Sequence, residues 1–301
     1  MYRINDEFLD CVFYLYPTKE DAIEGRKLGA SGFLVSLKSE SDLKFPHIYA
    51  VTNRHVIRPL NNLSRDTVSL FIRLNTKEGK TEIIPTTSED WIPHPNGDEI
   101  AVMPLPILFS NLRFKTIPSD TLVSESLVEK FNIGPGDEVF MVGRFINHEG
   151  KQRNLPSVRF GNISMMPLEP IISSWGMAQE SFTVEMRSLS GYSGSPVFVH
   201  MPRFVQSRHG SIPEGYQPGD YLLGIDWCHI NFKSQAVDDN DLPIEVWVKL
   251  NTGVAGVVPA WKIKEIFYEE ELIKRREKDE EEYLNQLGGT VIVASKLEED
   301  D

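Results

Sequence analysis

The stretch from Ser190 to Val197 places a serine between two glycines, directly before a β-prone run. Glycine allows backbone conformations that other residues avoid, so Gly191 can turn its own N–H and that of Ser193 toward one small cavity. A serine hydroxyl becomes a good nucleophile only when a base takes its proton and N–H groups stabilise the charge on the attacked carbonyl. The same residues also suit an ordinary turn between strands. The chemical interpretation therefore depends on a base and an acid elsewhere in the chain.

Candidates for both groups lie upstream of the serine. His55 follows the apolar run 48–52, which predicts a buried strand leading into a polar turn. Asp98 and Glu99 stand at the mouth of a second apolar strand. Successive strand residues face opposite sides, so only one of these carboxylates can reach His55 unless the backbone bulges. Each motif is weak alone, but their order along the chain predicts a catalytic triad.

With these motifs the chain resembles the trypsin-like (chymotrypsin-fold) serine peptidases, especially their bacterial cytosolic and HtrA-like branches. The resemblance implies an all-β fold of two six-stranded antiparallel β-barrels with a C-terminal α-helix. The expected protease domain covers 1–270, with barrel one at about 10–106, a linker at about 107–131 and barrel two at about 132–259. An acidic helix and tail follow over 260–301. The residues that carry the resemblance are Ser31 to Val35, Val51 to Val56, Asp98 to Val102 and Gly191 to Pro196.

The resemblance also implies a role for each matching residue. Ser193 is expected to be the nucleophile, His55 the general base and Asp98 the acid that orients it. The amides of Gly191 and Ser193 are expected to form the oxyanion hole. Ser195 is the competing nucleophile, and it ranks below Ser193 because Gly191 must precede the nucleophile by two positions. No cofactor and no metal are expected, since the chain has no metal-ligand spacing of histidines or cysteines.

Two departures from the family pattern affect the details. The triad acid usually stands directly before an apolar-Ala-apolar triplet, and here Glu99 holds that position. Residue type favours Asp98 and register favours Glu99; the prediction is Asp98. Tyr192 stands where many secreted members carry an aspartate that pairs with a newly formed N-terminus. Activation by cleavage near Met1 is therefore not expected.

Substrate preference rests on two further residues. Arg187, six positions before Ser193, stands where the floor of the specificity pocket begins in this family. An arginine there could pair with an acidic substrate side chain, and His229 on the pocket wall is compatible with this. The alternative, which is favoured, is that Arg187 points outward or pairs with Glu185 or Asp226.

Two other functional interpretations compete with a peptidase. An α/β-hydrolase would have its acid and histidine after the serine and helices between its strands, and this chain has neither pattern. A catalytically inactive scaffold or peptide-binding module of the same fold remains the alternative. The intact His55, Ser193 and Gly191 argue against it.

Composition predicts the setting in which the protein acts. The chain has 301 residues, 41% hydrophobic content and two cysteines, Cys11 and Cys228, far apart in sequence. Secreted relatives are commonly disulfide-linked, so two distant cysteines predict a cytoplasmic, intracellular protein. Together with the resemblance, this predicts an intracellular endopeptidase that acts on a limited set of protein or peptide substrates. A formal net charge of −13 argues against nucleic-acid partners. A polar N-terminus and the lack of a long apolar run predict no membrane association.

The C-terminal region predicts one helix from about Pro259 to Leu287, ended by Gly288 and Gly289. Its acidic run from Glu277 to Glu282 is expected to face solvent. A short strand is expected over 290–294. The simplest interpretation is a solvated helix end; the alternative is a docking element for a regulatory protein partner.

Overall fold

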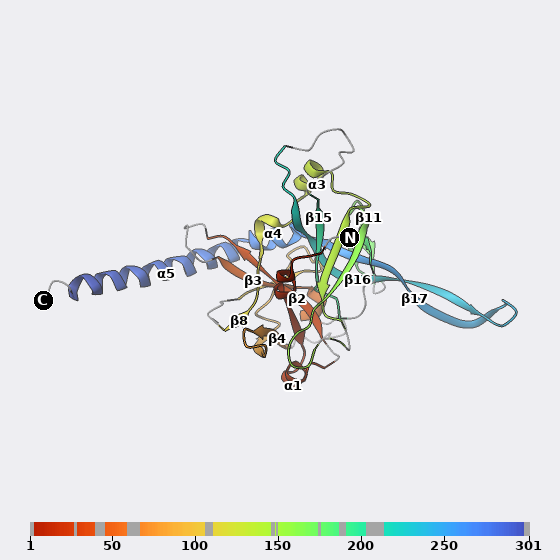
Figure 1. Cartoon of the computed structure of the whole chain (residues 1–301), viewed down its shortest axis with the longest axis horizontal. Coiled ribbons are helices and arrows are strands. Elements are labelled where there is room, and N and C mark those ends of the chain that lie inside the picture. The colour runs from red at the N-terminus through yellow and green to blue at the C-terminus, as the bar shows by residue number, and fades with distance from the viewer. Residues whose placement is uncertain are drawn as a thin grey trace.

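The computed structural model of the chain is mostly β-structure, and each half of the sequence builds its own sheet (Figure 1). Its described residues are 3–26, 29–39, 46–58, 67–105, 111–145, 148, 150–173, 176–186, 191–202 and 214–297. The prediction of a mostly β chain is confirmed.

The first half forms an open sheet of nine strands, ordered β5-β4-β1-β2-β3-β7-β6, with β8 on β4 and β9 on β2. The predicted closed barrel of six strands is therefore wrong for this half. The edge strands β5 and β6 do not pair with each other, and β6 has only two residues, too few to close a barrel. The strands are β1 (Val12–Tyr16), β2 (Ala30–Leu37), β3 (His47–Thr52), β4 (Ser69–Thr76), β5 (Thr81–Thr87), β6 (Ile92–Pro93), β7 (Ala101–Pro104), β8 (Leu112–Arg113) and β9 (Ile117–Pro118).

In the second half, six antiparallel strands pair in a ring, β10-β11-β14-β17-β16-β15. A separate two-stranded ladder, β12 with β13, lies between β11 and β14 in the chain. Because only this half pairs in a ring, the expectation of two barrels is not met. The strands are β10 (Glu138–Gly143), β11 (Ser157–Met165), β12 (Ile171–Ile172), β13 (Ala178–Gln179), β14 (Phe182–Glu185), β15 (Pro196–Met201), β16 (Gly219–Val237) and β17 (Pro243–Pro259).

The helices are short, apart from the last one. Helix α1 begins after Thr18, whose side chain accepts a hydrogen bond from the Asp21 amide at 3.1 Å. It ends at Gly25 in the left-handed conformation. The segment expected to be a linker contains two short strands and two short helices. The helices are η1 (Asp6–Cys11), α1 (Lys19–Glu24), α2 (Arg54–Ile57), η2 (Ser119–Thr121), α3 (Glu125–Phe131), α4 (Trp261–Phe267) and α5 (Glu270–Leu297).

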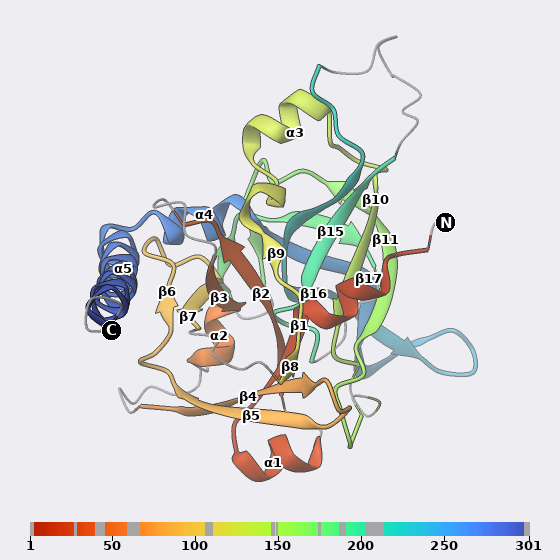
Figure 2. The same ribbon diagram turned by 60° about the vertical axis from the view of Figure 1, so that its left-hand side comes forward.

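The C-terminal region differs from the single predicted helix. Two helices, α4 and α5, are separated at Tyr268 and Glu269, and α5 continues through Gly288 and Gly289 and through the predicted strand at 290–294. A glycine inside a helix costs about 1 kcal/mol, which weakens the helix without necessarily ending it. Figure 2 shows α4 and the start of α5 beside β6 and β7, and Figure 1 shows the rest of α5 extending away from the body.

One buried core joins the two halves. Tyr14 and Phe33 of the first sheet belong to the same cluster of buried side chains as Phe140 and Trp227 of the second. The 3-10 helix η1 contributes Phe8, whose ring meets those of Phe140 and Phe198 edge-on at 5.2 and 4.8 Å. Because these side chains interdigitate across the junction, residues on facing strand ends of the two halves are held in fixed relative positions.

Among the described helices, none has both the length and the apolar character needed to cross a membrane.

Both cysteines are buried free thiols. Burial, together with the nearby Asp226 carboxylate, raises the pKa of Cys228 to about 12. Burial also raises the pKa of Cys11 far above its usual range. Since the thiolate is the reactive form, neither side chain should react near neutral pH while the protein is folded.

We therefore expect intact-mass spectrometry after iodoacetamide treatment at pH 8 to show no modification of the native protein. Two additions are expected after unfolding in guanidinium chloride. Rapid modification of the native protein at either cysteine would contradict the buried environments described above.

Candidate active site

The ends of two paired strands bring a histidine and a carboxylate together. Strand β3 pairs with β7 so that Thr52 lies opposite Ala101, and the chain beyond each of these residues carries His55 and Glu99 respectively. His55 Nδ1 lies 2.6 Å from Glu99 Oε2, and the His55 backbone N–H donates to the same oxygen at 3.2 Å. The Glu99 residue is fully buried. The carboxylate is therefore shielded from competing water, whereas the His55 side chain is partly exposed.

Asn53 fixes the backbone beneath this pair. Its side-chain amide, also fully buried, donates to the Glu99 carbonyl oxygen at 2.8 Å. When an imidazole donates from Nδ1 to a carboxylate, the neutral ring carries its lone pair on Nε2. That is the tautomer a general base needs, so the geometry gives His55 the form suited to accept a proton.

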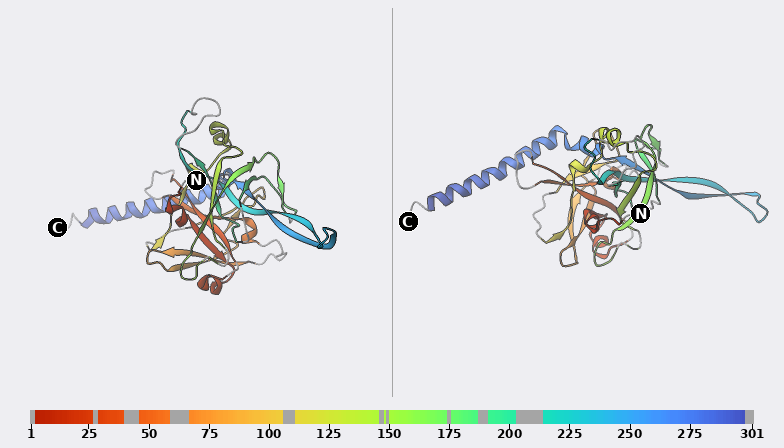
Figure 3. Two further views of the ribbon diagram at one scale, coloured as in Figure 1. Left: turned by 45° about the vertical axis from the view of Figure 1, so that its right-hand side comes forward. Right: turned by 45° about the horizontal axis from the view of Figure 1, so that its top comes forward.

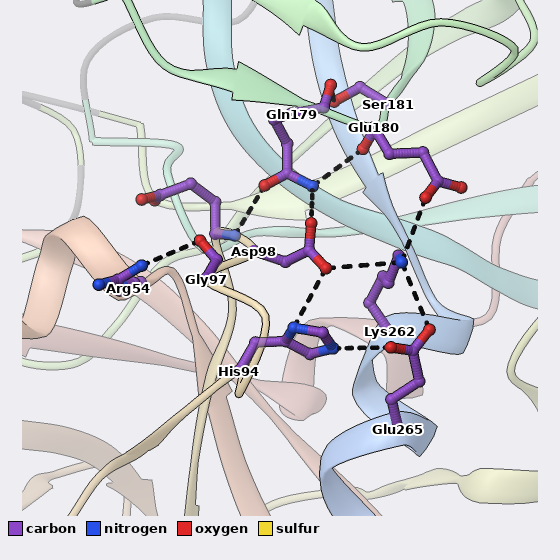
Figure 4. Close-up of polar contacts among 10 residues, drawn as sticks. Arg54, His94, Gly97, Asp98, Gln179, Glu180, Ser181, Lys262 and Glu265 are labelled. Carbon is purple, nitrogen blue, oxygen red and sulfur yellow. Dashed lines mark hydrogen bonds and ion pairs between the residues drawn. The ribbon is translucent and has the colours of Figure 1, made fainter.

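Asp98, the predicted acid, points away from His55. Its carboxylate accepts from Gln179 Nε2 at 2.7 Å and lies 3.1 Å from His94 Nδ1 (Figure 4). The turn at Gly97, with φ of +87°, and the bond from the Ile100 amide to the Asp98 carbonyl at 2.8 Å set the direction in which the chain enters β7. Glu99 and not Asp98 therefore contacts His55, because neighbouring residues at a strand entrance face opposite sides.

Asp98 instead belongs to a charged cluster that holds α4 to this turn. His94 is buried and lies between Asp98 and Glu265, whose Oε2 is 3.0 Å from His94 Nε2. The Lys262 ammonium lies 3.5, 3.2 and 3.4 Å from oxygens of Asp98, Glu180 and Glu265. Although burial lowers the pKa of Lys262, the hydrogen bond to Glu180 and the nearby carboxylates together raise it above its usual range. Figure 4 shows these contacts converging from α4 and the turn.

His94, Asp98 and Glu265 are close enough together to be considered as metal ligands. Lys262 already supplies a positive charge between these carboxylates, at salt-bridge distance from both. Both ring nitrogens of His94 also face carboxylate oxygens. The cluster is therefore explained by ion pairing alone, and its effect is to fix α4 against the acid-bearing turn.

Gln179 is a residue that the sequence analysis missed. Its side-chain oxygen accepts from the Glu99 amide at 2.8 Å, while its side-chain nitrogen donates to Asp98 and to the Glu180 carbonyl. Gln179 lies on β13 of the second half and is almost fully buried. A lone glutamine on a two-residue strand carries no signal in the sequence, so only the tertiary structure shows that it connects the acid to the other half.

The loop that carries Ser193 is built on glycine conformations. Gly191 and Gly194 have φ of +95° and +86°, in the region that side chains disfavour. The Ser195 amide donates to the Tyr192 carbonyl at 2.8 Å and closes a tight turn around Ser193. Among the described residues, the amides of Gly191 and Ser193 donate to no backbone carbonyl, which is the condition that an oxyanion-binding pair of N–H groups requires.

Ser31 of β2 attaches this loop to the first half. Its amide donates to the Ser193 carbonyl at 2.9 Å, and its hydroxyl donates to the Gly191 carbonyl at 3.2 Å. The Thr52 hydroxyl in turn donates to the Ser31 carbonyl at 2.8 Å. Since Thr52 ends β3 three positions before His55, these bonds hold the Ser193 turn at the strand end from which the histidine emerges.

The two candidate serines differ in access. Ser195 is fully buried, and its hydroxyl fills the space where a side chain at position 143 would begin: a Cβ on Gly143 would lie 2.0 Å from it. Ser193 is partly exposed. A substrate can therefore reach Ser193 and not Ser195.

Tyr192 has a structural role in this loop. Its ring is fully buried beneath the Arg159 guanidinium, 4.7 Å from the ring centroid, and its hydroxyl lies 2.6 Å from Ser157 Oγ. An aromatic side chain here anchors the turn to β11. It offers no carboxylate for an N-terminal ion pair.

The two residues expected to set specificity are less defined. Arg187 lies outside the described residues. His229 is on β16, three positions beyond Asp226, whose backbone exchanges hydrogen bonds with Gly194 and Ser195. Partial burial and the positive charge of Lys249 lower the pKa of His229, so its imidazole is neutral at pH 7. Its expected place on a substrate pocket stays a prediction.

No protein-family model matches the chain, and no curated protein matches it. Among solved structures it is similar to Deg5, with a TM-score of 0.44, 15% sequence identity and coverage of 74% of this chain and 81% of that one. It is similar to the HtrA-type protease AlgW with a tripeptide (TM-score 0.43, 16% identity, covering 87% of this chain and 62% of AlgW). The same protease with a decapeptide gives a TM-score of 0.41 at 15% identity, over 79% and 52% of the two chains. The chain thus spans little more than half the length of these AlgW structures.

The docked turn makes a prediction about Gly194. A Cβ at this position would lie 2.0 Å from the Ser31 carbonyl oxygen and 2.6 Å from the Thr52 hydroxyl. We expect Gly194→Ala to lower the thermal unfolding temperature, because it adds a clash at the junction to the roughly 1–2 kcal/mol cost of a left-handed non-glycine residue. Circular dichroism melting curves measure the effect.

Gly79→Ala is the matched control. Its φ is +77° and no atom lies within 4 Å of the added Cβ, so it isolates the backbone cost. Equal losses of stability in the two variants would show that the Gly194 contacts with β2 and β3 contribute nothing.

Proposed function

We propose that this chain is a serine endopeptidase that cleaves protein or peptide substrates through an acyl-enzyme, with Ser193, His55 and Glu99 as its triad. The observation that carries the proposal is the 2.6 Å contact between His55 Nδ1 and the buried Glu99 carboxylate. This pair stands at the strand end on which the Ser193 turn is docked through Ser31. An imidazole oriented by a buried carboxylate, and a partly exposed serine on a glycine turn bonded to the same sheet, supply the groups that acyl transfer needs.

In the proposed reaction His55 transfers a proton from Ser193 to the leaving amine of the substrate. Ser193 Oγ attacks the substrate carbonyl carbon while His55 Nε2 takes the hydroxyl proton, and the carbonyl oxygen becomes an oxyanion near the Gly191 and Ser193 amides. The tetrahedral intermediate collapses, the C–N bond breaks, and His55 gives its proton to the leaving amine. Water then repeats the sequence on the acyl-enzyme, which releases the carboxylic acid and restores Ser193.

Glu99 assists both halves of this cycle. Its carboxylate holds the imidazole in one orientation and stabilises the imidazolium that forms when His55 accepts a proton. A buried carboxylate acts strongly here because little water screens its charge. The Glu99 backbone is fixed because its carbonyl accepts from Asn53 and its amide donates to Gln179, so its side chain reaches His55 from the position two residues before β7.

The remaining functional expectations are part of the same proposal. We place Arg187 and His229 at the substrate pocket, a regulatory protein on the C-terminal helix and the site of action inside the cell. The buried thiols of Cys11 and Cys228 support a setting in which disulfides are not needed for folding.

A fluorophosphonate probe tests the nucleophile directly. We expect the purified protein to be labelled and Ser193→Ala to lose all labelling. Ser195→Ala is the matched control and should keep it, because that hydroxyl is buried. Absence of labelling in the wild-type protein would leave the inactive scaffold as the better interpretation. Persistence of labelling in Ser193→Ala would show that another serine is the nucleophile.

The two neighbouring carboxylates give a second test. We expect Glu99→Gln to reduce kcat/KM by about 10³–10⁴-fold, since the amide no longer holds the required tautomer or stabilises the imidazolium. Asp98→Asn should reduce it about tenfold or less, because Asp98 touches His94 and Lys262 and not His55. The kcat/KM of each variant is measured with one peptide substrate selected from a peptide library. A larger loss in Asp98→Asn than in Glu99→Gln would restore Asp98 as the acid.

A further inference from the structure

Strands β16 and β17 continue well beyond the second sheet as a two-stranded arm (Figure 3). Strand β16 pairs with β15 only up to Ile225, and β17 pairs with β14 only from Val254 onward. From Asn231 to Asn251 the two strands pair only with each other among the described strands. Figure 1 shows this arm extending from the body on the side opposite α5. We call residues 231–251 the arm.

One face of the arm is apolar and carries no charge. Phe232 lies opposite Leu250, and Ser234 lies opposite Val248, so these four side chains share a face. Nearer the tip the register shifts, because β17 has two more residues than β16 between the pairs Gln235–Trp247 and Val237–Pro243. Two is an even number, so alternation along β17 keeps Val246 and Ile244 on the apolar face. The exposed fractions of the large apolar residues are 57% for Phe232, 47% for Leu250, 43% for Val248, 53% for Val246 and 38% for Ile244.

The opposite face is mostly polar, with Trp247 at its middle and Val237 opposite Pro243 near the tip as its apolar residues. Lys233 lies opposite Lys249, and Gln235 lies opposite Trp247. A ribbon with one apolar and one polar face has the pattern of a strand pair whose apolar side is covered. An isolated two-stranded hairpin is at best marginally stable in water, and packing of one face against another element is what stabilises it.

The occupant must cover a face, which distinguishes between candidates. An extended peptide that adds to a free edge would satisfy backbone groups and leave the apolar face open. A lipid bilayer is disfavoured because the tip carries Asp238, Asp239 and Asp241, and because the chain has a formal net charge of −13. A second copy of the arm offers an uncharged apolar face of the same width and length, and it is present whenever the protein is.

We propose that the apolar face of the arm binds the same face of a second copy, so that two ribbons pack face to face about a twofold axis. Such isologous contacts are self-complementary by symmetry, and stacked β-layers lie about 10 Å apart with interdigitating side chains. Lys233 and Lys249 would then remain in water on the outer faces. This proposal does not depend on the proposed peptidase activity.

The size of the apolar face limits the affinity expected for the dimer. Specific complexes bury roughly 1,200–2,000 Å² in total, and five large apolar side chains from each copy place this contact toward the small end. We therefore expect a dimer that dissociates on dilution. Since two copies of a strongly acidic chain repel each other, added salt should screen that repulsion and strengthen the dimer.

Sedimentation velocity over a range of protein and salt concentrations tests the contact. We expect the mass to rise from 34.2 kDa toward twice that value with protein concentration, and more readily at high salt. Val248→Lys, which places a charge on the apolar face, should remain monomeric. Gln235→Lys is the matched control, with the same charge on the opposite face, and should still dimerise.

Cysteine cross-linking gives a second readout that does not depend on how well a charged variant folds. Ser234→Cys on the apolar face should form a cross-linked dimer with a short bis-maleimide, and Gln235→Cys on the other face should not. The native Cys11 and Cys228 are buried and give little background. A wild-type protein that stays monomeric at high concentration and salt would overturn the proposal. So would a dimer unaffected by Val248→Lys, equal cross-linking from both faces, or a monomer that instead binds vesicles through the arm.

Discussion

The hydrogen bonds of Ser31 are the interaction on which the candidate site depends. This fully buried residue of β2 receives a hydrogen bond from the Arg144 amide at its hydroxyl and from the Thr52 hydroxyl at its carbonyl. It donates to the carbonyls of Gly191 and Ser193. Two of these bonds attach the Ser193 turn to the sheet that carries His55, and the other two hold Ser31 to Thr52 and Arg144. Buried polar groups must find partners inside the protein, so loss of this registry would leave several of them unsatisfied.

The acid side of the site shows how charge is distributed among neighbouring residues. Glu99 is buried and serves His55, whereas Asp98, one position earlier, joins Lys262 and His94 in holding α4. Separation of the two carboxylates onto opposite sides of the chain avoids the cost of burying like charges together. It also means that the C-terminal helix α4 braces the turn from which Glu99 emerges, although α4 lies more than 150 positions further along the chain.

The body and the arm differ in what stabilises them. In the body, side chains of both sheets meet in a continuous core, and the candidate site lies where that core joins the halves. The arm has two strands and no second layer among the described residues, so its apolar face remains exposed. Strands β16 and β17 therefore run from the body, where the core covers their apolar side chains, into the arm, where we propose that a second copy covers them.

Sequence alone was sufficient for those features that depend on local chemistry. The order of the histidine, carboxylate and serine motifs, the glycine turn around Ser193 and the mostly β character were all readable, because turns and alternation act over a few residues. The sequence also limited the acid to Asp98 or Glu99. It favoured Asp98 on residue type, although its own register argument pointed to Glu99.

Only the tertiary structure decided which carboxylate faces His55, because that depends on how the Gly97 turn enters β7 and on what Asp98 meets across the junction. Gln179 contacts Glu99 and Lys262 contacts Asp98 from far along the chain, and no spacing in the sequence encodes such contacts. The open first sheet was likewise beyond local reasoning, since closure of a barrel depends on whether distant edge strands meet. Alternation within a strand is local, whereas pairing between strands depends on the whole fold.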